Sequence, residues 1–217
     1  MTWILNAFDF LCKGGPVMPP LIVCSVVSLA VMVERYVRLR RARGESASLM
    51  ARVENFLALG KYQDAARACE CEQTPLGDML AAGLKCSEAG QAERCMEERA
   101  LKTTPELFKR LSILDTIITI APLLGLLGTV TGMIRSFHVI STKTGLGTPT
   151  GITGGVAEAL IATATGLAIA IATLVGYNYL TERAKVISSD MEFYGTRLVN
   201  ILSSGKEEQH EAKAVGA

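Results

Sequence analysis

Hydrophobic residues gather into three long blocks along this chain, near residues 17–33, 111–140 and 152–180, and charged residues crowd into the segments between them. At 1.5 Å per residue, the second and third blocks can each cross a hydrocarbon core of about 30 Å. The first block, VMPPLIVCSVVSLAVMV, is uncharged and close to the lower limit for a spanning helix. The pattern therefore predicts an all-α integral membrane protein with three transmembrane helices.

The first block is either a cleaved secretory signal or a retained membrane anchor. It is followed by ERYVRLRRAR, a strongly cationic segment that offers no small-residue cleavage site. Secretory signals carry their cations before the apolar stretch and the small residues after it. The reversed order favours a retained transmembrane helix.

The positions of the cations predict the orientation. Arginines follow the first block, cations flank the inner ends of the other two, and the connection STKTGLGTPTG offers only Lys143. The positive-inside rule then puts the N-terminus outside and the C-terminus inside. The expected segments are an outward N-terminal segment at 1–15, transmembrane helices at 16–34, 111–140 and 154–180, a cytoplasmic helical region at 35–110, a periplasmic loop at 141–153, and a cytoplasmic C-terminal helix and tail at 181–217.

The cytoplasmic region has the pattern of several amphipathic helices. SASLMARVENFLAL places its large apolar residues on one helical face and is followed by Gly60. Further helices are expected in YQDAARACE, in LGDMLAAGLKCSEAG up to Gly90, and from Gln91 onward, with Pro105 as a kink or boundary. The final GKEEQHEAKAVGA is expected to be a solvated, frayed tail.

Composition excludes several function classes. A net charge of +1, without a basic stripe interleaved with aromatics, gives no reason to expect nucleic acid as a partner. No Ser-His-Asp set, paired catalytic acids or phosphate loop appears, so we expect neither an enzyme nor a cofactor.

The cysteines are expected to be small, buried, reduced thiols. A metal site is the weaker alternative, because C-x-C spacing suits tetrahedral zinc poorly; its ligands would be Cys69, Cys71, Cys86 and Cys95.

Small residues recur along the second and third blocks. Helices in lipid gain little from the hydrophobic effect when they associate, so close packing of small side chains holds them together. The residues expected to provide this packing are Gly125, Gly128, Gly132, Ala162 and Gly166. Small residues occur on more than one side of these helices, and three spans cannot cover all those surfaces. We therefore expect a homo-oligomer.

Hydroxyl groups of the two blocks fall at one depth. Counted at 1.5 Å per residue, Thr129 lies about 16 Å and Thr163 about 14 Å below the outer surface. Thr131 and Thr165 flank that level. Any one of these threonines could simply return its hydroxyl to a carbonyl of its own helix. Together they predict the polar lining of an ion path, with Thr131 and Thr165 as possible further members.

Charged residues within the blocks are harder to explain by packing. Arg135 and Glu158 match in depth, about 6–8 Å from the outer surface. Glu158 could form a structural pair with Arg135, face a pore as a functional group, or extend its carboxylate to the interface. Asp115 is more typical of an interfacial or capping residue than of an ion path. His138 is likewise expected at the interface, with proton handling as the alternative.

Two segments carry a family resemblance. APLLGLLGTVTGMIRSF at 121–137 and GVAEALIATATGLAIAI at 155–171 resemble the MotA/TolQ/ExbB proton-channel family, and PLLGLLGTVTGM is most similar to its ExbB branch. The resemblance implies a pentamer in the bacterial inner membrane whose second and third helices line a pore. That pore would hold an ExbD-type dimer of single-span helices, each with an intramembrane aspartate. A TonB-type protein would pass the work of proton flow to outer-membrane transporters.

The family motifs carry over onto three residues. Thr129 and Thr163 would form a ring of hydroxyls facing the partner's aspartate, and Glu158 would face the pore near its outer vestibule. One departure is that Ala172 and Thr173 stand where the family commonly has a proline after GLAIAI, so the kink there is absent or weaker. A TolQ-type subunit, a related ion-driven stator and a passive scaffold stay open as alternatives, as does sodium in place of protons.

Overall fold

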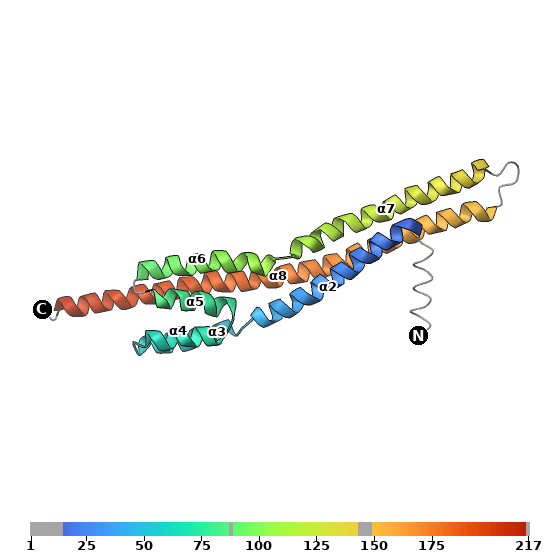
Figure 1. Ribbon diagram of the computed structural model, residues 1–217. Coiled ribbons are helices and arrows are strands. Elements are labelled where there is room, and N and C mark those ends of the chain that lie inside the picture. Colours follow the sequence, from blue (N-terminus) through green and yellow to red (C-terminus); the bar gives the residue numbers. More distant parts are fainter. Residues whose placement is uncertain (1–14, 87–88, 143–148, 216–217) are drawn as a thin grey trace, which may run out of the picture. The chain divides into compact units, whose positions relative to one another are not determined.

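The computed structural model describes the backbone of residues 15–86, 89–142 and 149–215, and the side chains of residues 15–86, 90–138 and 153–204. Every regular element within these ranges is helical, so the all-α prediction is confirmed. The expected N-terminal segment except Gly15, and residues 143–148 of the expected periplasmic loop, lie outside the described residues; the rest of that loop is helical, since α7 extends to Thr142 and α8 begins at Pro149. Figure 1 traces the elements in chain order: η1 Gly15–Val17, α2 Met18–Ala42, α3 Ser46–Ala58, α4 Tyr62–Cys71, α5 Pro75–Lys85, α6 Ala89–Phe108, α7 Leu111–Thr142 and α8 Pro149–Val215.

Three helical stretches of the described chain are long and apolar enough to cross a membrane, as the three hydrophobic blocks predict. They lie within Gly15–Ala58, Gly90–His138 and Thr153–Ser204. The chain divides into two compact units. A membrane unit combines the chain up to Glu34 with Arg110–Tyr179, and a second unit combines Arg35–Lys109 with the chain from Leu180 onward.

The membrane unit is held together where the start of α2 meets α7 and α8. Val17, Met18 and Leu21 pack with Ile117 and Ala121 of α7 in one buried cluster, together with Ala170 of α8. Farther along, Gly176 of α8 lies against the side chain of Met32, where an added Cβ would overlap the sulfur. Many other apolar side chains of this unit are exposed on the single chain, including Val26, Leu126, Phe137, Leu160 and Val175. These faces suit lipid or further helices.

The second unit packs helices against the C-terminal part of α8. Figure 1 shows α5 and α6 alongside it, and α4 packs with α3 and α5. Ser46 donates a hydrogen bond to Asp190 (3.0 Å), and Arg197 forms an ion pair with Glu54 (2.6 Å). Its buried apolar side chains include Leu49, Met50, Val53, Leu80, Met191 and Leu198. Thr74 and Pro75 start α5 as helix-capping rules predict, because the Thr74 hydroxyl accepts the Gly77 N–H at 3.1 Å.

The expected end of one helix at Gly90, and the reading of Pro105 as a helix boundary, are wrong. α5 ends at Lys85 instead of continuing to Gly90, and Pro105 lies inside α6. The break before the second span comes at Arg110, whose φ of 64° no helix can contain. The carbonyls of Glu106 and Leu107 in the last turn of α6 accept hydrogen bonds from the Arg35 side chain of α2, a contact that the sequence could not reveal. The expected frayed tail is also wrong, since α8 is helical as far as Val215.

The expectation of free, buried cysteines is wrong for several of them. Cys86 and Cys95 form a disulfide, which joins the residue after α5 to the second turn of α6. Cys71 is free but exposed, while Cys69 is free and buried. A spacing of nine residues gave no sign that the two helix ends would meet.

Helix α8 runs without interruption through the position where the family commonly has a proline. Thr173 is 1% exposed, and its hydroxyl donates to the Ile169 carbonyl at 2.8 Å within the same helix. Threonine keeps the backbone N–H that proline lacks, so the hydrogen-bond ladder is not interrupted there.

Candidate ion-conducting site

Helices α7 and α8 approach each other through glycines. A Cβ on Gly166 would lie 2.5 Å from the Ala121 carbonyl oxygen, and a Cβ on Gly128 would lie 2.5 Å from the Ala162 Cβ. A Cβ on Gly132 would lie 2.7 Å from the Gly155 carbonyl oxygen. These distances leave no room for a side chain, so the two backbones touch. The residues expected to provide packing lie at this contact, including Gly125.

A hydrogen bond joins the two helices at the same level. The Thr163 hydroxyl of α8 donates to the Gly125 carbonyl of α7 at 3.0 Å, and it also lies 3.3 Å from the Ala159 carbonyl of its own helix. A Cβ on Gly125 would lie 3.0 Å from Thr163 Cα, so glycine allows this approach. The donated hydrogen leaves the hydroxyl oxygen able to accept from another group.

Thr129 lies close to the level of Thr163 along the paired helices. Gly128 of α7 and Ala162 of α8 are in contact, and Thr129 and Thr163 are the next residues in the two helices. Thr129 donates to the Leu126 carbonyl at 2.6 Å. Its side chain is half-buried, as is that of Thr163. In both threonines the hydroxyl hydrogen is donated to a carbonyl, and the hydroxyl oxygen can still accept a hydrogen bond.

The two flanking threonines make bonds within their own helices. The Thr131 hydroxyl donates to the Leu127 carbonyl at 3.0 Å and lies 3.1 Å from that of Gly128. The Thr165 hydroxyl donates to the Ile161 carbonyl at 2.8 Å. These contacts satisfy the polar groups without a second helix, which is the usual way that threonine is accommodated in a membrane helix.

Above the threonines lies an ion pair. Arg135 of α7 contacts Glu158 of α8 at 2.8 Å, with side chains 55% and 20% exposed. Glu158 also lies against Gly15, whose φ of 73° and missing side chain leave space for the carboxylate; a Cβ there would overlap it. The carboxylate therefore lies beside both Arg135 and the first turn before α2, where helix N-termini favour negative charge.

Sequence reasoning missed the role of Gly15, although Gly-Gly-Pro before the first span was a visible turn signal. It also missed Ser136, which is buried and donates to the Gly132 carbonyl at 3.1 Å. The structure does not bring Asp115 to this site, because fourteen residues of helix separate it from Thr129, about 21 Å. His138 is exposed toward the opposite end of α7.

Residues 72–193, which include α7 and much of α8, match the MotA/TolQ/ExbB proton channel family. The chain belongs to this family. It is 35% identical to the putative biopolymer transport protein ExbB-like 3 of Synechocystis sp., over 76% of this chain and 80% of that protein. It is 26% identical to the biopolymer transport protein ExbB of Neisseria meningitidis serogroup A, over 79% of this chain and 84% of that protein.

Membership of the MotA/TolQ/ExbB family establishes the class of the protein. It is a proton-channel subunit most like ExbB and not an enzyme. With three membrane-capable helices, it is a multi-pass protein of the inner membrane. A shorter match of 42% identity to ExbB of Helicobacter pylori covers 42% of this chain and 62% of that protein. These relatives do not favour the TolQ alternative.

Proposed function

We propose that this chain is the channel subunit of an ExbB–ExbD-type complex that uses the proton motive force to energise TonB-dependent outer-membrane transport. The observation that carries the proposal is the pair of hydroxyls, Thr129 and Thr163, held at one level by glycine-packed helices. The names of its relatives support the ExbB assignment over the TolQ alternative.

The hydroxyl pair suits a carboxylic acid that loads and releases a proton. Each threonine oxygen can accept a hydrogen bond from a protonated aspartic acid of a partner helix, and neither carries a charge that would trap the ion. The Thr163 bond to Gly125 keeps its oxygen at a constant position while the partner changes its protonation state. Thr131 and Thr165 belong to the same lining as secondary members.

The Arg135–Glu158 pair forms the outer entrance of the path. Glu158 is the less exposed of the two, at 20%, and would attract cations toward the threonines below. Arg135 limits that attraction by holding the carboxylate in one place. Asp115, far down α7, acts as an interfacial group at the opposite end.

The proposed assembly is a pentamer with the N-terminus outside and the C-terminus inside. The cations after the first span favour this orientation by the positive-inside rule. Exposed apolar side chains on α7 and α8, such as Leu126, Val130, Leu160 and Leu167, provide surface for neighbouring subunits, for lipid and for the helices of an ExbD-type dimer. The TonB-type protein would take up the resulting movement.

Proton flux in liposomes tests the proposal. The chain is co-reconstituted with its single-span partner, and an inward proton gradient is followed with a pH-sensitive dye. Flux should require both proteins and fall when the partner's intramembrane aspartate becomes asparagine. A complex that forms but passes no protons would be a passive scaffold and would overturn the proposal. Restoring TonB-dependent uptake in a strain lacking its own ExbB separates this role from a TolQ-type one.

A further inference from the structure

A cavity of about 420 Å³ opens in the second unit, where α2 lies near the start of α5 and the end of α6. This volume is within the range of small-molecule sites. Its cationic lining comes from two directions: Arg35, Arg38 and Arg41 from α2, and Arg99 and Lys102 from α6. We call this cavity the basic pocket.

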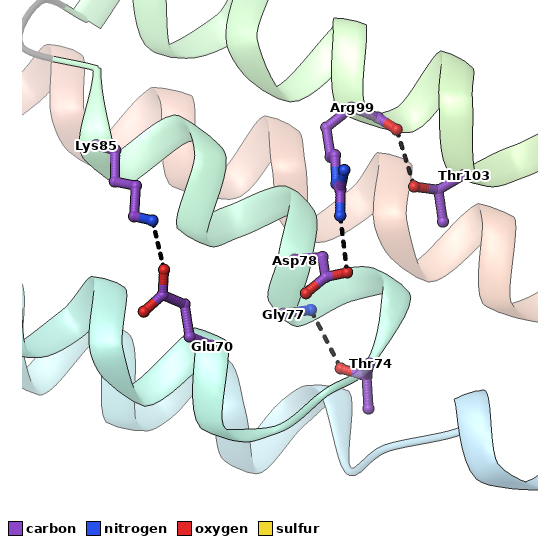
Figure 2. A network of polar contacts seen from close by, with 7 residues as sticks. All are labelled: Glu70, Thr74, Gly77, Asp78, Lys85, Arg99 and Thr103. Atoms are coloured by element: carbon purple, nitrogen blue, oxygen red, sulfur yellow. Dashed lines mark hydrogen bonds and ion pairs between the residues drawn. The ribbon is translucent and has the colours of Figure 1, made fainter.

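The basic pocket has more positive than negative charge. Two carboxylates line it, Asp78 and Glu106, against five cationic side chains. Figure 2 shows Arg99 reaching from α6 to Asp78 at the start of α5, and the two groups are 3.0 Å apart. Lys102 is likewise paired, with Glu98 at 2.9 Å, so the net positive charge of the lining comes from the three arginines of α2 set against Glu106.

Part of the pocket wall is fixed in place. Arg35 is only 2% exposed, and its guanidinium donates to the carbonyls of Glu106 (2.9 Å) and Leu107 at the end of α6. This attachment holds α2 against α6. Thr74 and Thr103 also line the pocket, and Figure 2 shows the Thr74 hydroxyl accepting from Gly77 and the Thr103 hydroxyl donating to the Arg99 carbonyl. A preformed wall lowers the entropic cost of binding a ligand.

The chain locates this pocket at the membrane surface. The apolar stretch of α2 ends at Val33, so Arg38 and Arg41 follow it by about 8 Å and 12 Å of helix. The polar layer of a bilayer adds roughly 5–8 Å on each side of the hydrocarbon core, so Arg38 falls at its edge and Arg41 about one helical turn beyond it. Arginine side chains reach along apolar surface and keep their guanidinium groups among headgroups. Several cations directly after a transmembrane helix are the pattern that binds anionic lipid.

We propose that the basic pocket binds the phosphate headgroup of an acidic phospholipid, with Arg38, Arg41 and Lys102 as the main contacts. A phosphodiester offers oxygens that guanidinium groups bind in a bidentate manner, and the acyl chains continue into the bilayer beside the apolar part of α2. This binding is separate from the proton path, since its residues belong to the second unit and include none of the threonines of α7 and α8. Bound lipid would stabilise the contact between α2 and α6.

Native mass spectrometry of the full-length chain in a neutral detergent tests this proposal. The probes are phosphatidylglycerol, phosphatidylcholine and inorganic phosphate. We expect one phosphatidylglycerol per chain to be retained preferentially. The double substitution R38Q/R41Q should weaken its binding at least about tenfold, at the roughly 1 kcal/mol contributed by each cation near a lipid surface. K102Q, on a different helix, should weaken it about threefold to fivefold.

The matched control is R40Q/R43Q. It removes the same charge from the same segment, but Arg40 and Arg43 do not line the basic pocket, so binding should change less than about twofold. Equal losses in the two double variants would mean diffuse attraction and would overturn the proposal. Equal retention of phosphatidylcholine, or displacement of the lipid by an equal concentration of inorganic phosphate, would overturn it too. If R38Q/R41Q fails to fold, the K102Q variant decides by itself, and unchanged binding of phosphatidylglycerol in K102Q would overturn the proposal.

Discussion

Thr163 of α8 donates its hydroxyl hydrogen to the main-chain carbonyl of Gly125 in α7, 38 positions away in the sequence, at 3.0 Å. The bond forms only because Gly125 has no side chain, so the helices touch at that point. A polar group that the lipid cannot hydrate is thereby satisfied, and its oxygen keeps a fixed position. This residue pair therefore contributes both to the packing of α7 on α8 and to the proposed ion path.

Replacing Thr163 by valine keeps the shape and removes the hydroxyl. We expect proton flux to fall about tenfold, equivalent to roughly 1.4 kcal/mol, while the unfolding free energy falls by only about 1 kcal/mol. Thr163→Ser should keep most of the flux. The control is Thr119→Val, since the Thr119 hydroxyl donates to the main-chain carbonyl of Asp115 in its own helix at 3.2 Å. Full activity in the Thr163→Val complex would remove this hydroxyl from the ion path.

Glycine contacts between α7 and α8 can be tested with a matched pair on one helix. Gly166→Ala would push a Cβ to 2.5 Å from the Ala121 carbonyl oxygen, which should lower stability by about 1–3 kcal/mol. Gly154→Ala meets no atom of the described chain within 4 Å and should be neutral or stabilising by up to about 1 kcal/mol. Thermal unfolding in detergent measures both. Equal effects of the two substitutions would contradict backbone contact at Gly166.

The Arg135–Glu158 pair should matter more for conduction than for stability. With Arg135 55% exposed, breaking the pair should cost under about 1 kcal/mol of unfolding free energy. Arg135→Gln and Glu158→Gln should each reduce flux, and the swap R135E/E158R should recover part of it. Gly15→Ala, which crowds the carboxylate, should resemble Glu158→Gln. A swap no better than either single change would rule out a functional pair.

Arg35 should be required for the second unit to fold firmly. Its guanidinium is buried and donates to two carbonyls at the end of α6, and lysine cannot provide two fixed donors in one plane. Arg35→Lys should therefore cost about 2 kcal/mol and speed hydrogen exchange in the last turn of α6. Arg40→Lys, at an exposed position of the same helix, is the control. Unchanged exchange in the Arg35 variant would contradict this role.

The free cysteines should differ in reactivity with pH. Burial raises the pKa of the Cys69 thiol to about 12, partly offset by the nearby Arg52. Because the thiolate is the reactive form, maleimide at pH 8 should label exposed Cys71 and leave Cys69 unmodified until the protein unfolds. A raised pKa means that this burial stabilises the fold fully below about pH 9, and that the contribution is lost as pH rises toward 12. Equal labelling at pH 8 would show that Cys69 is accessible.

The sequence by itself determined the class of this protein. A membrane core requires long apolar helices, so the three blocks predicted the three spans by length alone. Helices in lipid need small contact residues, so Gly128 and Gly166 could be recognised as packing positions. The common depth of Thr129 and Thr163 followed from the constant helical rise, and two motifs carried the family.

Only the tertiary structure decided which groups meet. Several contacts join residues that are far apart in local sequence terms, and they depend on how the helices are rotated and connected. They are the bond from Thr163 to Gly125, the space that Gly15 leaves for Glu158, the attachment of Arg35 to the end of α6, and the Cys86–Cys95 disulfide. The same holds for the break at Arg110, where the local sequence offered only Pro105 as a kink or boundary. Helical periodicity specifies which residues share a face, but the packing of one helix on another specifies what that face contacts.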